Sequence, residues 1–439
     1  MITGDIHTTQ RVLCALFGPR EERSFAIRLW NGITEMPLYG TPLFTIVLKR
    51  PGALRRILLP LSEISLTEAY LSGDADIEGG IEAAAELPNI VVRSIGSLRR
   101  YAQLFPSLLK LPSDRARNDV WLHRARRLWR YGRQHTAPRD TQAVRFHYDV
   151  GNAFYALWLD RRMLYSCAYF EPGVDDLDTA QEAKLDLICR KLRLSPGERL
   201  LDIGCGWGGL IQYAAERYGV EALGVVLSQP QADEASARLA AAGLSDRCRV
   251  EVRDYRTLTE LNAFDKIASV GMVEHVGRKQ LPTYFATAYH TLKPGGLFLN
   301  HGIVSLSDAR PISLSDRFAS AVWKRGAFID RYVFPDGCLV PLADMIGAAE
   351  ASGFETRDVE SLREHYTKTL RHWVGRLESS ASEAVRLVGE QTYRVWRLYL
   401  ASSAHAFTTA SIGIAQTLLA KPDAAGRSNV PPTRRDLYN

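Results

Sequence analysis

The sequence predicts an α/β protein in which helices cover both faces of a doubly wound parallel sheet, with a small α+β domain before it. Strand-like and helix-like segments alternate from Arg199 onward, and the first of these strands ends in a glycine-rich turn. Such alternation is typical of parallel sheets. Residues 25–92 show a separate pattern of their own. We therefore expect an accessory α+β domain over residues 1–112, a basic linker or helix over 113–140, and the main domain over 141–439.

The accessory domain is indicated by short local signals. Residues 38–42 contain a glycine and a proline and favour a turn, and Phe44–Leu48 is rich in β-branched residues and favours a strand. Further along, residues 66–70 favour a short helix, residues 73–80 a loop of Gly and Asp, and residues 81–87 a second helix.

The main domain shows a longer and more regular alternation. Predicted strands cover residues 199–204, 222–227, 248–252, 266–270 and 296–300, and predicted helices cover residues 209–218, 229–241 and 280–292. The chain after Ser361 turns helical again, and residues 411–419 favour a final strand. Parallel sheets of this kind bind ligands at the carboxyl ends of their strands, so we expect the functional site there.

Charge is unevenly distributed along the chain. The net charge is +6, but residues 93–139 hold twelve Lys or Arg against two Asp, so this segment carries about +10 and the remainder about −4. In residues 121–131 the cations alternate with Trp121, Leu128 and Trp129, which can share one broad helical face. The pattern fits a helix lying on an anionic membrane, and it fits equally an interdomain helix. The charge alone would also suit a nucleic acid partner or a plain solvated linker.

Composition points to an ordinary globular protein, 46% hydrophobic and 24% charged over 439 residues. The six cysteines form no CxxC pair and no His cluster has metal-ligand spacing, so we expect a reducing compartment and no metal site. The first twenty residues lack the apolar core of a secretory signal, and no run approaches the ~18 apolar residues of a spanning helix. These features favour a cytoplasmic protein that binds peripherally to the inner face of the membrane.

A donor-binding motif follows the first predicted strand. It reads Leu201-Asp202-Ile203-Gly204-Cys205-Gly206-Trp207-Gly208. Glycines at the start of a helix let the backbone approach a ligand. The acid lies on the strand, two residues before the first glycine, whereas the dinucleotide pattern has a later acid. The motif resembles the first motif of class I methyltransferases, where the glycines flank the methionine portion of S-adenosylmethionine and the acid orients its ammonium group. A purely structural strand-to-helix turn is the alternative.

Two further segments complete the expected donor site. After the second strand many methyltransferases place an acid that holds the ribose hydroxyls, but this chain has Ser228 and Gln231 there instead. After the third strand comes Asp254-Tyr255-Arg256, where an adenine edge is expected, and Tyr255 can stack on the base.

Four separated segments carry a more specific signal. They are Phe146-His147-Tyr148-Asp149-Val150-Gly151-Asn152, Tyr165-Ser166-Cys167-Ala168-Tyr169-Phe170, Gly271-Met272-Val273-Glu274-His275-Val276-Gly277 and His365-Tyr366-Thr367-Lys368. In order and spacing they resemble the cyclopropane fatty acid synthase family, which includes the mycolic acid cyclopropane synthases. The resemblance covers roughly residues 140–420, and residues 25–92 are similar to the accessory domain of the bacterial members that act on phospholipids. It implies a Rossmann-like, seven-stranded class I methyltransferase sheet.

The resemblance also implies a chemistry. In this family the cis double bond of an acyl chain attacks the sulfonium methyl, and a base removes a proton from the resulting carbocation so that the ring closes. A bound bicarbonate ion serves as that base. Its ligands map onto Cys167 and Ile303 through their backbones, and onto Glu274, His301 and Tyr366. Donor contacts map onto Tyr165, Ser166, Asp202, Gly204, Gly206, Trp207, Ser228, Gln231, Tyr255 and Arg256, and we include Cys205 and Gly208 of the same loop.

Each candidate residue also has a structural interpretation. Cys167, His301 and Tyr366 can simply pack in a core. Glu274 and His275, if they end a strand, point apart, and we expect Glu274 to face the site. Tyr165 and Tyr169 can stabilise a cation through their ring faces. Ser403 stands where the family usually carries Cys, which affects the expected shape of the acyl channel. Residues 305–334 resemble a covering loop, with Phe318, Val322, Trp323, Phe328 and Ile329 suited to an acyl chain or to a core.

The combined expectation is an enzyme that forms cyclopropane rings on unsaturated acyl chains of membrane phospholipids, docked on anionic headgroups. Three rival functions are methylation without ring closure, methylation of a small hydrophobic amine, and a non-enzymatic lipid-binding or donor-sensing role. A nucleic acid substrate is not expected, because no Asn/Asp-Pro-Pro-Tyr/Phe motif is present. A homodimer is left open.

Overall fold

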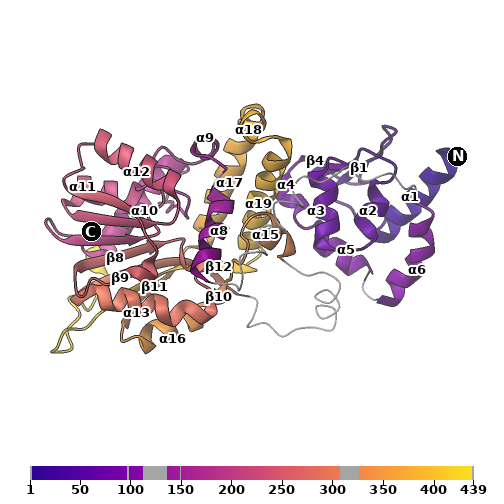
Figure 1. Ribbon diagram of the computed structural model, residues 1–439. Helices are drawn as coiled ribbons and strands as arrows, with labels where there is room; N and C mark the ends of the chain where they lie inside the picture. The colour runs from indigo at the N-terminus through magenta and orange to yellow at the C-terminus, as the bar shows by residue number, and fades with distance from the viewer. Residues whose placement is uncertain (1, 96–97, 112–135, 149, 307–325, 438–439) are drawn as a thin grey trace. The chain divides into compact units, whose positions relative to one another are not determined.

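The computed structural model describes residues 2–95, 98–111, 136–148, 150–306 and 326–437 (Figure 1). The chain divides into two compact units. The first comprises Met1–Arg127, Arg310–Pro335 and Val388–His405, and the second comprises Leu128–Ala309, Asp336–Leu387 and Ala406–Asn439. The 121–131 segment lies outside the described residues, as do Phe318, Val322 and Trp323.

The first unit is built around a four-stranded sheet in the order β2-β1-β3-β4. Its strands are β1 (Ala26–Arg28), β2 (Thr34–Glu35), β3 (Phe44–Leu48) and β4 (Ala75–Gly79), and its helices are α1 (Ile2–Phe17), α2 (Ala53–Leu58), α3 (Glu63–Leu71), α4 (Ile81–Ala84), α5 (Leu87–Ile95) and α6 (Leu98–Leu109). Helix α15 (Ala327–Tyr332) and most of α19 (Glu390–Thr408) also belong to this unit. The expected strand at Phe44–Leu48 and the helix around residues 66–70 are confirmed.

The prediction of a loop over residues 73–80 is wrong, because Ala75–Gly79 pairs antiparallel with β3 and places Ile46 opposite Ile77. The Gly and Asp residues suggested a loop, but the acids are held by cations. Asp76 bonds Arg394 of α19 at 3.0 Å, and Asp74 pairs with Arg50 at 3.3 Å. Paired carboxylates of this kind make a charged edge strand tolerable.

The second unit contains the main sheet, with strand order β11-β12-β9-β8-β5-β6-β7 and the short β10 beside β9. The seven strands of this order confirm the expected seven-stranded sheet. They are β5 (Arg199–Ile203), β6 (Glu221–Val226), β7 (Cys248–Val252), β8 (Phe264–Val270), β9 (Leu292–Ser305), β11 (Glu355–Ser361) and β12 (Ile412–Ala420), and β10 is Val340–Pro341. The sheet is parallel except at β12, which runs antiparallel to both of its neighbours.

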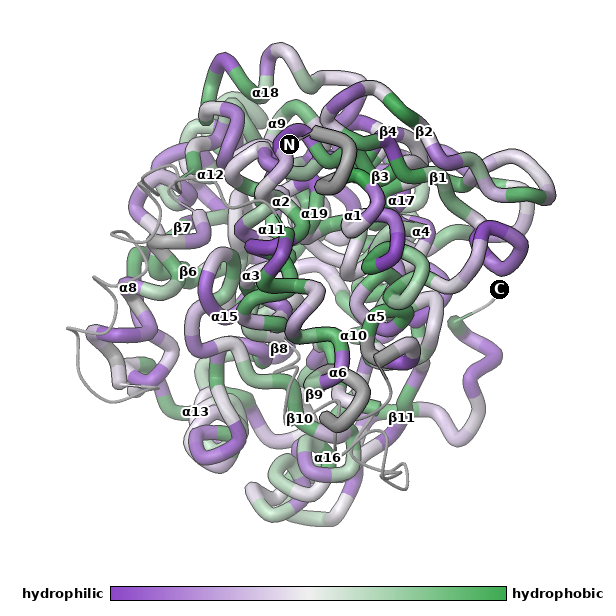
Figure 2. The backbone as a smooth tube through the Cα atoms, turned by 90° about the vertical axis from the view of Figure 1, so that its right-hand side faces the viewer, coloured by the Kyte–Doolittle hydropathy of each residue, from purple (hydrophilic) through white to green (hydrophobic). Residues whose placement is uncertain are grey.

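Helices cover both faces of this sheet, as the alternation along β9 requires. Leu297 and Leu299 pack into the core formed with α10 (Leu177–Leu192) and α11 (Gly209–Tyr218), whereas Phe298 packs toward α13 (Leu281–Thr291) and α16 (Leu342–Ala351). Figure 1 shows α11 and α12 (Gln229–Ala241) on one side of the strands and α13 with α16 on the other. Figure 2 shows the corresponding hydrophobic stretches of the strands in green.

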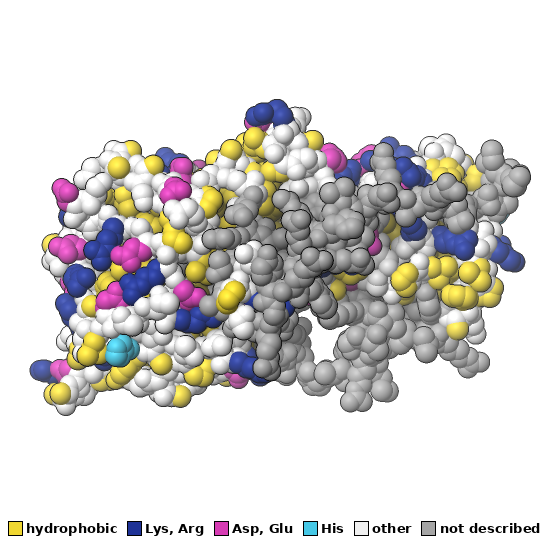
Figure 3. Space-filling view, in the orientation of Figure 1, with side chains coloured by type: hydrophobic (Ala, Val, Ile, Leu, Met, Phe, Trp, Pro, Cys, Tyr) yellow, Lys and Arg dark blue, Asp and Glu magenta, His cyan; other side chains and the backbone are white. Residues whose placement is uncertain are grey.

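The remaining helices are α8 (Ala137–Tyr148), α9 (Asn152–Ala156), α17 (Arg363–Ser379) and α18 (Ala381–Val388). The predicted helices at 209–218 and 229–241 are confirmed to the residue, while the strand expected at 296–300 is the middle of the 14-residue β9. On the face shown in Figure 3, Lys and Arg side chains lie interspersed with Asp and Glu over the second unit. Within the described part of the chain, no helix is both long and apolar enough to cross a bilayer.

Candidate active site

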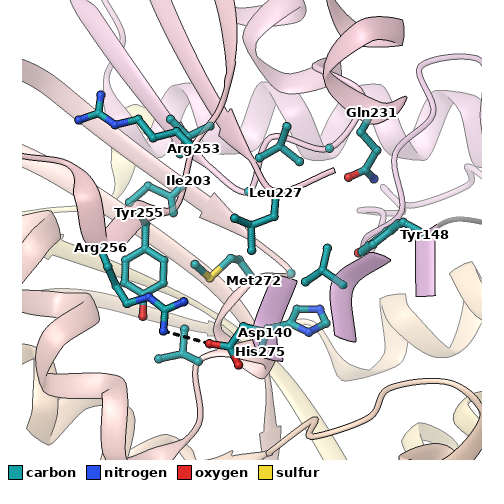
Figure 4. Close-up of a pocket in the computed structure, with 17 residues that line it drawn as sticks. Asp140, Tyr148, Ile203, Leu227, Gln231, Arg253, Tyr255, Arg256, Met272 and His275 are labelled. Atoms are coloured by element: carbon teal, nitrogen blue, oxygen red, sulfur yellow. Dashed lines mark hydrogen bonds and ion pairs between the residues drawn. The ribbon is translucent and has the colours of Figure 1, made fainter. Parts of the chain in front are cut away.

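Two adjoining cavities lie where the parallel strands end. One, of about 100 Å³, is lined by residues that follow β5, β6, β7 and β8, and the other, of about 70 Å³, reaches toward α10. They share Tyr148, Gly204, Gly206, Gln231 and Gly271. In Figure 4, Tyr148 and Gln231 approach the first cavity from one side, and Tyr255 with Arg256 from the other. This is the edge at which the sequence predicted a ligand site.

The three glycines of the 202–208 loop differ in what they do. All have positive φ, a conformation that side chains disfavour. A side chain at Gly206 would point into open space, with Gln231 Nε2 the nearest atom at 4.0 Å, whereas one at Gly204 would meet Met272 at 3.0 Å. Gly208 does not line either cavity but lets α11 approach Ala235 of α12. The loop therefore exposes backbone to the cavity at the first two glycines and packs helices at the third.

The second cavity is lined by Asp202 and by a buried lysine that belongs to none of the sequence motifs. Lys184 of α10 is 1% exposed, and its Nζ donates a 2.8 Å hydrogen bond to Ser166 Oγ. Burial raises the pKa of Asp202 to about 7, against the opposing effect of the Lys184 charge. Burial likewise lowers the pKa of Lys184 to about 8. One signal was present in the sequence, because Lys184 falls on the apolar face of a helix, where an unpaired cation is costly.

The other expected donor residues lie around the same space. Tyr165, Ser166, Cys205 and Trp207 line the second cavity, and Trp207 Nε1 donates to Asn152 Oδ1 at 2.9 Å. Tyr255 and Arg256 line the first cavity, and Arg256 is fixed by Asp254 at 2.6 Å and by Asp140 at 3.0 Å, the dashed pair in Figure 4. Ser228 precedes α12 and lines neither cavity, and its buried hydroxyl has no hydrogen-bond partner among the described residues. A buried polar group of this kind is a position for a ligand contact.

Three of the five residues expected at the base site are linked by a short chain of contacts. Ile303 on β9 pairs with Ile414 on β12, whose carbonyl accepts a hydrogen bond from Leu362 N at 3.0 Å. The carbonyl of Leu362 accepts from Tyr366 N at 3.0 Å and lies 3.7 Å from Cys167 Sγ. The Cys167 thiol is buried, and burial raises its pKa, so it is an inert neutral group there.

Glu274 is connected to this group through Ile303. It lies in a 3-10 turn, Val273–His275, and not on a strand end, so the expectation that it and His275 alternate on a strand is wrong. Its Oε1 accepts a 2.7 Å hydrogen bond from Ile303 N, while Oε2 is buried and has no partner among the residues that the structure describes. Burial raises the pKa of Glu274 to about 7. Glycine at 302 makes this approach possible, because a side chain there would overlap Val273.

His301 lies two residues before Ile303 on β9 and is 1% exposed. Burial and the charges of Lys184 and Lys191 hold its pKa well below the usual range, so the ring is neutral. Its Nε2 is buried and meets no hydrogen-bond partner within the described ranges. An unsatisfied donor or acceptor on His301 and an unsatisfied carboxylate oxygen on Glu274 fit an ion such as bicarbonate, which both accepts and donates hydrogen bonds.

Several other expected residues take structural roles. The ring of Tyr169 stacks on that of His365 with centroids 4.7 Å apart, whereas Tyr165 sits among Trp158, Trp373 and His147. Ser403 lies half-buried on α19, and Phe328 is buried on α15, both in the first unit. All six cysteines are free, and the described residues contain no group of side chains suited to a metal ion.

Comparison with known proteins matches residues 135–417 to the family described as mycolic acid cyclopropane synthetase. A "Probable fatty acid methyltransferase" of Pseudomonas putida is 40% identical over 94% of this chain and 95% of its own length. The "Cyclopropane-fatty-acyl-phospholipid synthase" of Escherichia coli is 33% identical over 86% of this chain and 87% of its own. The crystal structure of mycolic acid cyclopropane synthase CmaA1 complexed with SAH and CTAB superposes with a TM-score of 0.59, at 34% identity over 64% of this chain and 97% of that one.

The sheet order and the glycine loop, together with these matches, define a class I S-adenosylmethionine-dependent methyltransferase. Within that class the chain belongs to the cyclopropane synthase family.

The raised pKa of Asp202 predicts a pH dependence of donor binding. A carboxyl with a pKa of about 7 is mostly protonated at pH 6 and must lose its proton to pair with the ammonium group of S-adenosylmethionine. We therefore expect donor affinity to rise about tenfold between pH 6 and pH 8, with proton release on binding. Calorimetry in buffers of different ionisation enthalpy measures both.

The Asp202→Asn variant is the matched control. The donor's own amino group titrates near pH 8 in both proteins, so it cancels in the comparison. An equal pH dependence in the variant and the wild type would contradict the assignment of the titrating group to Asp202.

Proposed function

We propose that this protein transfers a methylene group from S-adenosylmethionine to the cis double bond of unsaturated acyl chains in membrane phospholipids, forming cyclopropane rings. The observation that carries the proposal is the pair of unsatisfied buried atoms, His301 Nε2 and Glu274 Oε2, within the group that also contains Cys167, Ile303 and Tyr366. Such a group suits the reaction because the carbocation formed by methylation of an alkene must lose a proton to a base.

The residues of the proposed site form two parts, one that binds the donor and one that holds the base. S-adenosylmethionine supplies the methyl group as an activated sulfonium. Backbone at Gly204 and Gly206 approaches the donor, Asp202 pairs with its ammonium group, and Ser228 with Gln231 supplies polar contacts to the ribose. Tyr255 and Arg256 border the adenine. Fixed contacts of this kind align the methyl group with the double bond, and alignment matters because an alkene is a weak nucleophile.

The second part of the proposed site, which holds the base, must control which proton the carbocation loses. Bicarbonate supplies the base when bound, and His301, Tyr366 and the backbones of Cys167 and Ile303 would hold it. Glu274 accepts a hydrogen bond from Ile303 N. Because its pKa is about 7, its carboxyl group can accept or share a proton at this position. The aromatic cluster that includes Tyr148, Tyr165 and Trp373 excludes water and offers ring faces to positive charge.

A second candidate function is methylation without ring closure, giving a methyl-branched or unsaturated methyl fatty acid. The specific observation in its favour is the Pseudomonas putida relative, named a probable fatty acid methyltransferase and 40% identical over almost the whole chain. The two functions share the donor and the carbocation. An unsaturated methyl product forms when the proton leaves a neighbouring chain carbon instead of the new methyl group, whereas a saturated methyl-branched product would also need a hydride from an external reductant. Methylation of a small hydrophobic amine has no comparable observation to support it.

The product assay separates these functions. Incubating the purified protein with labelled S-adenosylmethionine and vesicles of unsaturated phospholipid should give acyl chains heavier by one methylene that resist hydrogenation, as a cyclopropane ring does under mild conditions. Mass spectrometry before and after hydrogenation measures this. A product of the same mass that takes up hydrogen would establish the second candidate, and no lipid product would refute both.

Substitution of Glu274 tests the base site. Glu274→Gln keeps the shape but removes the charge and the proton acceptor, so we expect kcat to fall by at least about 100-fold, while the donor dissociation constant changes less than about twofold. Glu355→Gln, at a carboxylate on β11 that bonds Arg357, is the matched control and should keep wild-type turnover. Wild-type turnover in Glu274→Gln would remove this residue from the base site.

We further propose that the basic segment 93–139 binds the anionic inner surface of the membrane. The sequence carries this proposal through its charge of about +10, since residues 112–135 lie outside the described structure. Replacing Arg124, Arg126, Arg127 and Arg130 by Gln should weaken sedimentation with anionic vesicles, and salt should weaken wild-type binding in the same way. Salt-insensitive binding that the replacements leave unchanged would identify the segment as a linker. A homodimer stays a prediction.

A further inference from the structure

His301 faces a glutamine across two neighbouring strands. In the antiparallel pair of β9 and β12, Gln416 lies directly opposite His301, and both side chains are 1% exposed. Gln416 Nε2 is 3.3 Å from His301 Nδ1. The two residues are 115 positions apart in the chain, and neither lies in the four sequence segments that resemble the cyclopropane synthase family.

A buried lysine fixes the orientation of the Gln416 amide. Lys191 of α10 is 1% exposed, and its Nζ donates a 2.8 Å hydrogen bond to Gln416 Oε1. An ammonium group has only donors, so the amide oxygen must face it and the amide nitrogen must face the imidazole. Lys191 is itself held by Glu360 and, at 3.6 Å, by Asp358. The amide cannot rotate by half a turn without placing two donors together.

The orientation of the amide determines which imidazole nitrogen carries the hydrogen. The Gln416 N–H group donates, so His301 Nδ1 must accept, and in a neutral ring the hydrogen is then on Nε2. The cations Lys184 and Lys191 and the burial of the ring keep it neutral. His301 Nε2 is buried and has no hydrogen-bond partner in the described part of the chain. It is thus a hydrogen-bond donor in a dry environment.

We infer that Gln416 and Lys191 are positioning residues that lock His301 in its Nε2–H tautomer, so that His301 donates a hydrogen bond to the anion at the base site. The identity of that anion rests on the proposed function, but the tautomer does not. An imidazole of the other tautomer would present a lone pair, which could accept only from the anion's O–H group and would face its charged oxygens unfavourably. A preorganised donor facing a negative charge contributes strongly to catalysis in a site that excludes water.

The test uses Gln416→Glu, which has nearly the same shape but replaces the donating amide by an accepting carboxylate. Nitrogen-15 and carbon-13 spectra of histidine-labelled protein report the tautomer, and a His301→Gln sample assigns the resonance among the ten histidines. We expect the Nε2–H form in the wild type, and hydrogen on Nδ1 in Gln416→Glu. We expect kcat to fall by at least about 100-fold there, with donor affinity retained.

Lys191 gives a second pair of variants. Lys191→Met frees the amide and should produce a mixture of tautomers with an intermediate loss of kcat, and Lys191→Arg, which also has only donors, should restore the Nε2–H form. Thr417→Val is the matched control. Thr417 is the next residue of β12, is 2% exposed, and donates to Asn300 O on β9 at 3.1 Å, so its loss affects packing but not His301.

The outcomes separate this inference from the proposed function. A wild-type His301 with hydrogen on Nδ1, or a Gln416→Glu protein that keeps hydrogen on Nε2, would overturn the inference. If Gln416→Glu does not fold, the spectra of Lys191→Met and Lys191→Arg decide in the same way. A confirmed tautomer shift in a protein that makes no cyclopropane lipid would refute the proposed function and leave the inference standing.

Discussion

Two ammonium groups buried on one face of α10 are the constraint on which both ends of the site depend. Lys184 and Lys191 are seven residues apart, so they project to the same side of the helix, toward the sheet. A buried cation must be matched by acceptors, or its burial costs several kcal/mol. Lys184 therefore bonds Ser166 and lies near Asp202, where the donor binds. Lys191 bonds Glu360 and Gln416 beside the proposed base site. Loss of either charge would leave a carboxylate or an amide buried without its partner.

The same arrangement explains how the acidities of Asp202 and Glu274 can differ in their response to neighbouring charges. Burial raises the pKa of both Asp202 and Glu274 to about 7, yet only Asp202 lies close enough to Lys184 for that charge to oppose the shift. Asp202 is thus prepared to ionise when a cationic donor arrives. Glu274, whose hydrogen-bond partner is a backbone N–H, remains able to hold or release a proton near neutral pH. Two buried acids in one protein therefore serve different chemistry because their neighbours differ.

Much of the main domain was predictable because its signals are local. The 202–208 loop and the helices after β5 and β6 are each specified by short stretches of sequence, and the same holds for the strand of residues 44–48 in the first unit. The sequence predicts a loop at the acid-rich strand β4, because the cations that pair with it, such as Arg394, come from far along the chain. The role of Gln416 depends on β12 running antiparallel beside β9, and the role of Lys191 on where α10 packs. Neither follows from spacing, and both require the tertiary structure.

Gly302 has a consequence that extends beyond packing. The turn carrying Glu274 lies so close to β9 that even a methyl group at position 302 would displace Val273 and move the acid away from the strand that carries His301. The spacing between the carboxylate and the imidazole is thus set by a residue with no functional group of its own. A substitution there would move the Glu274 carboxylate relative to the His301 imidazole without touching any ligand. Under the proposed function, the choice between ring closure and methylation without it would then depend as much on the backbone of this strand as on the side chains beside it.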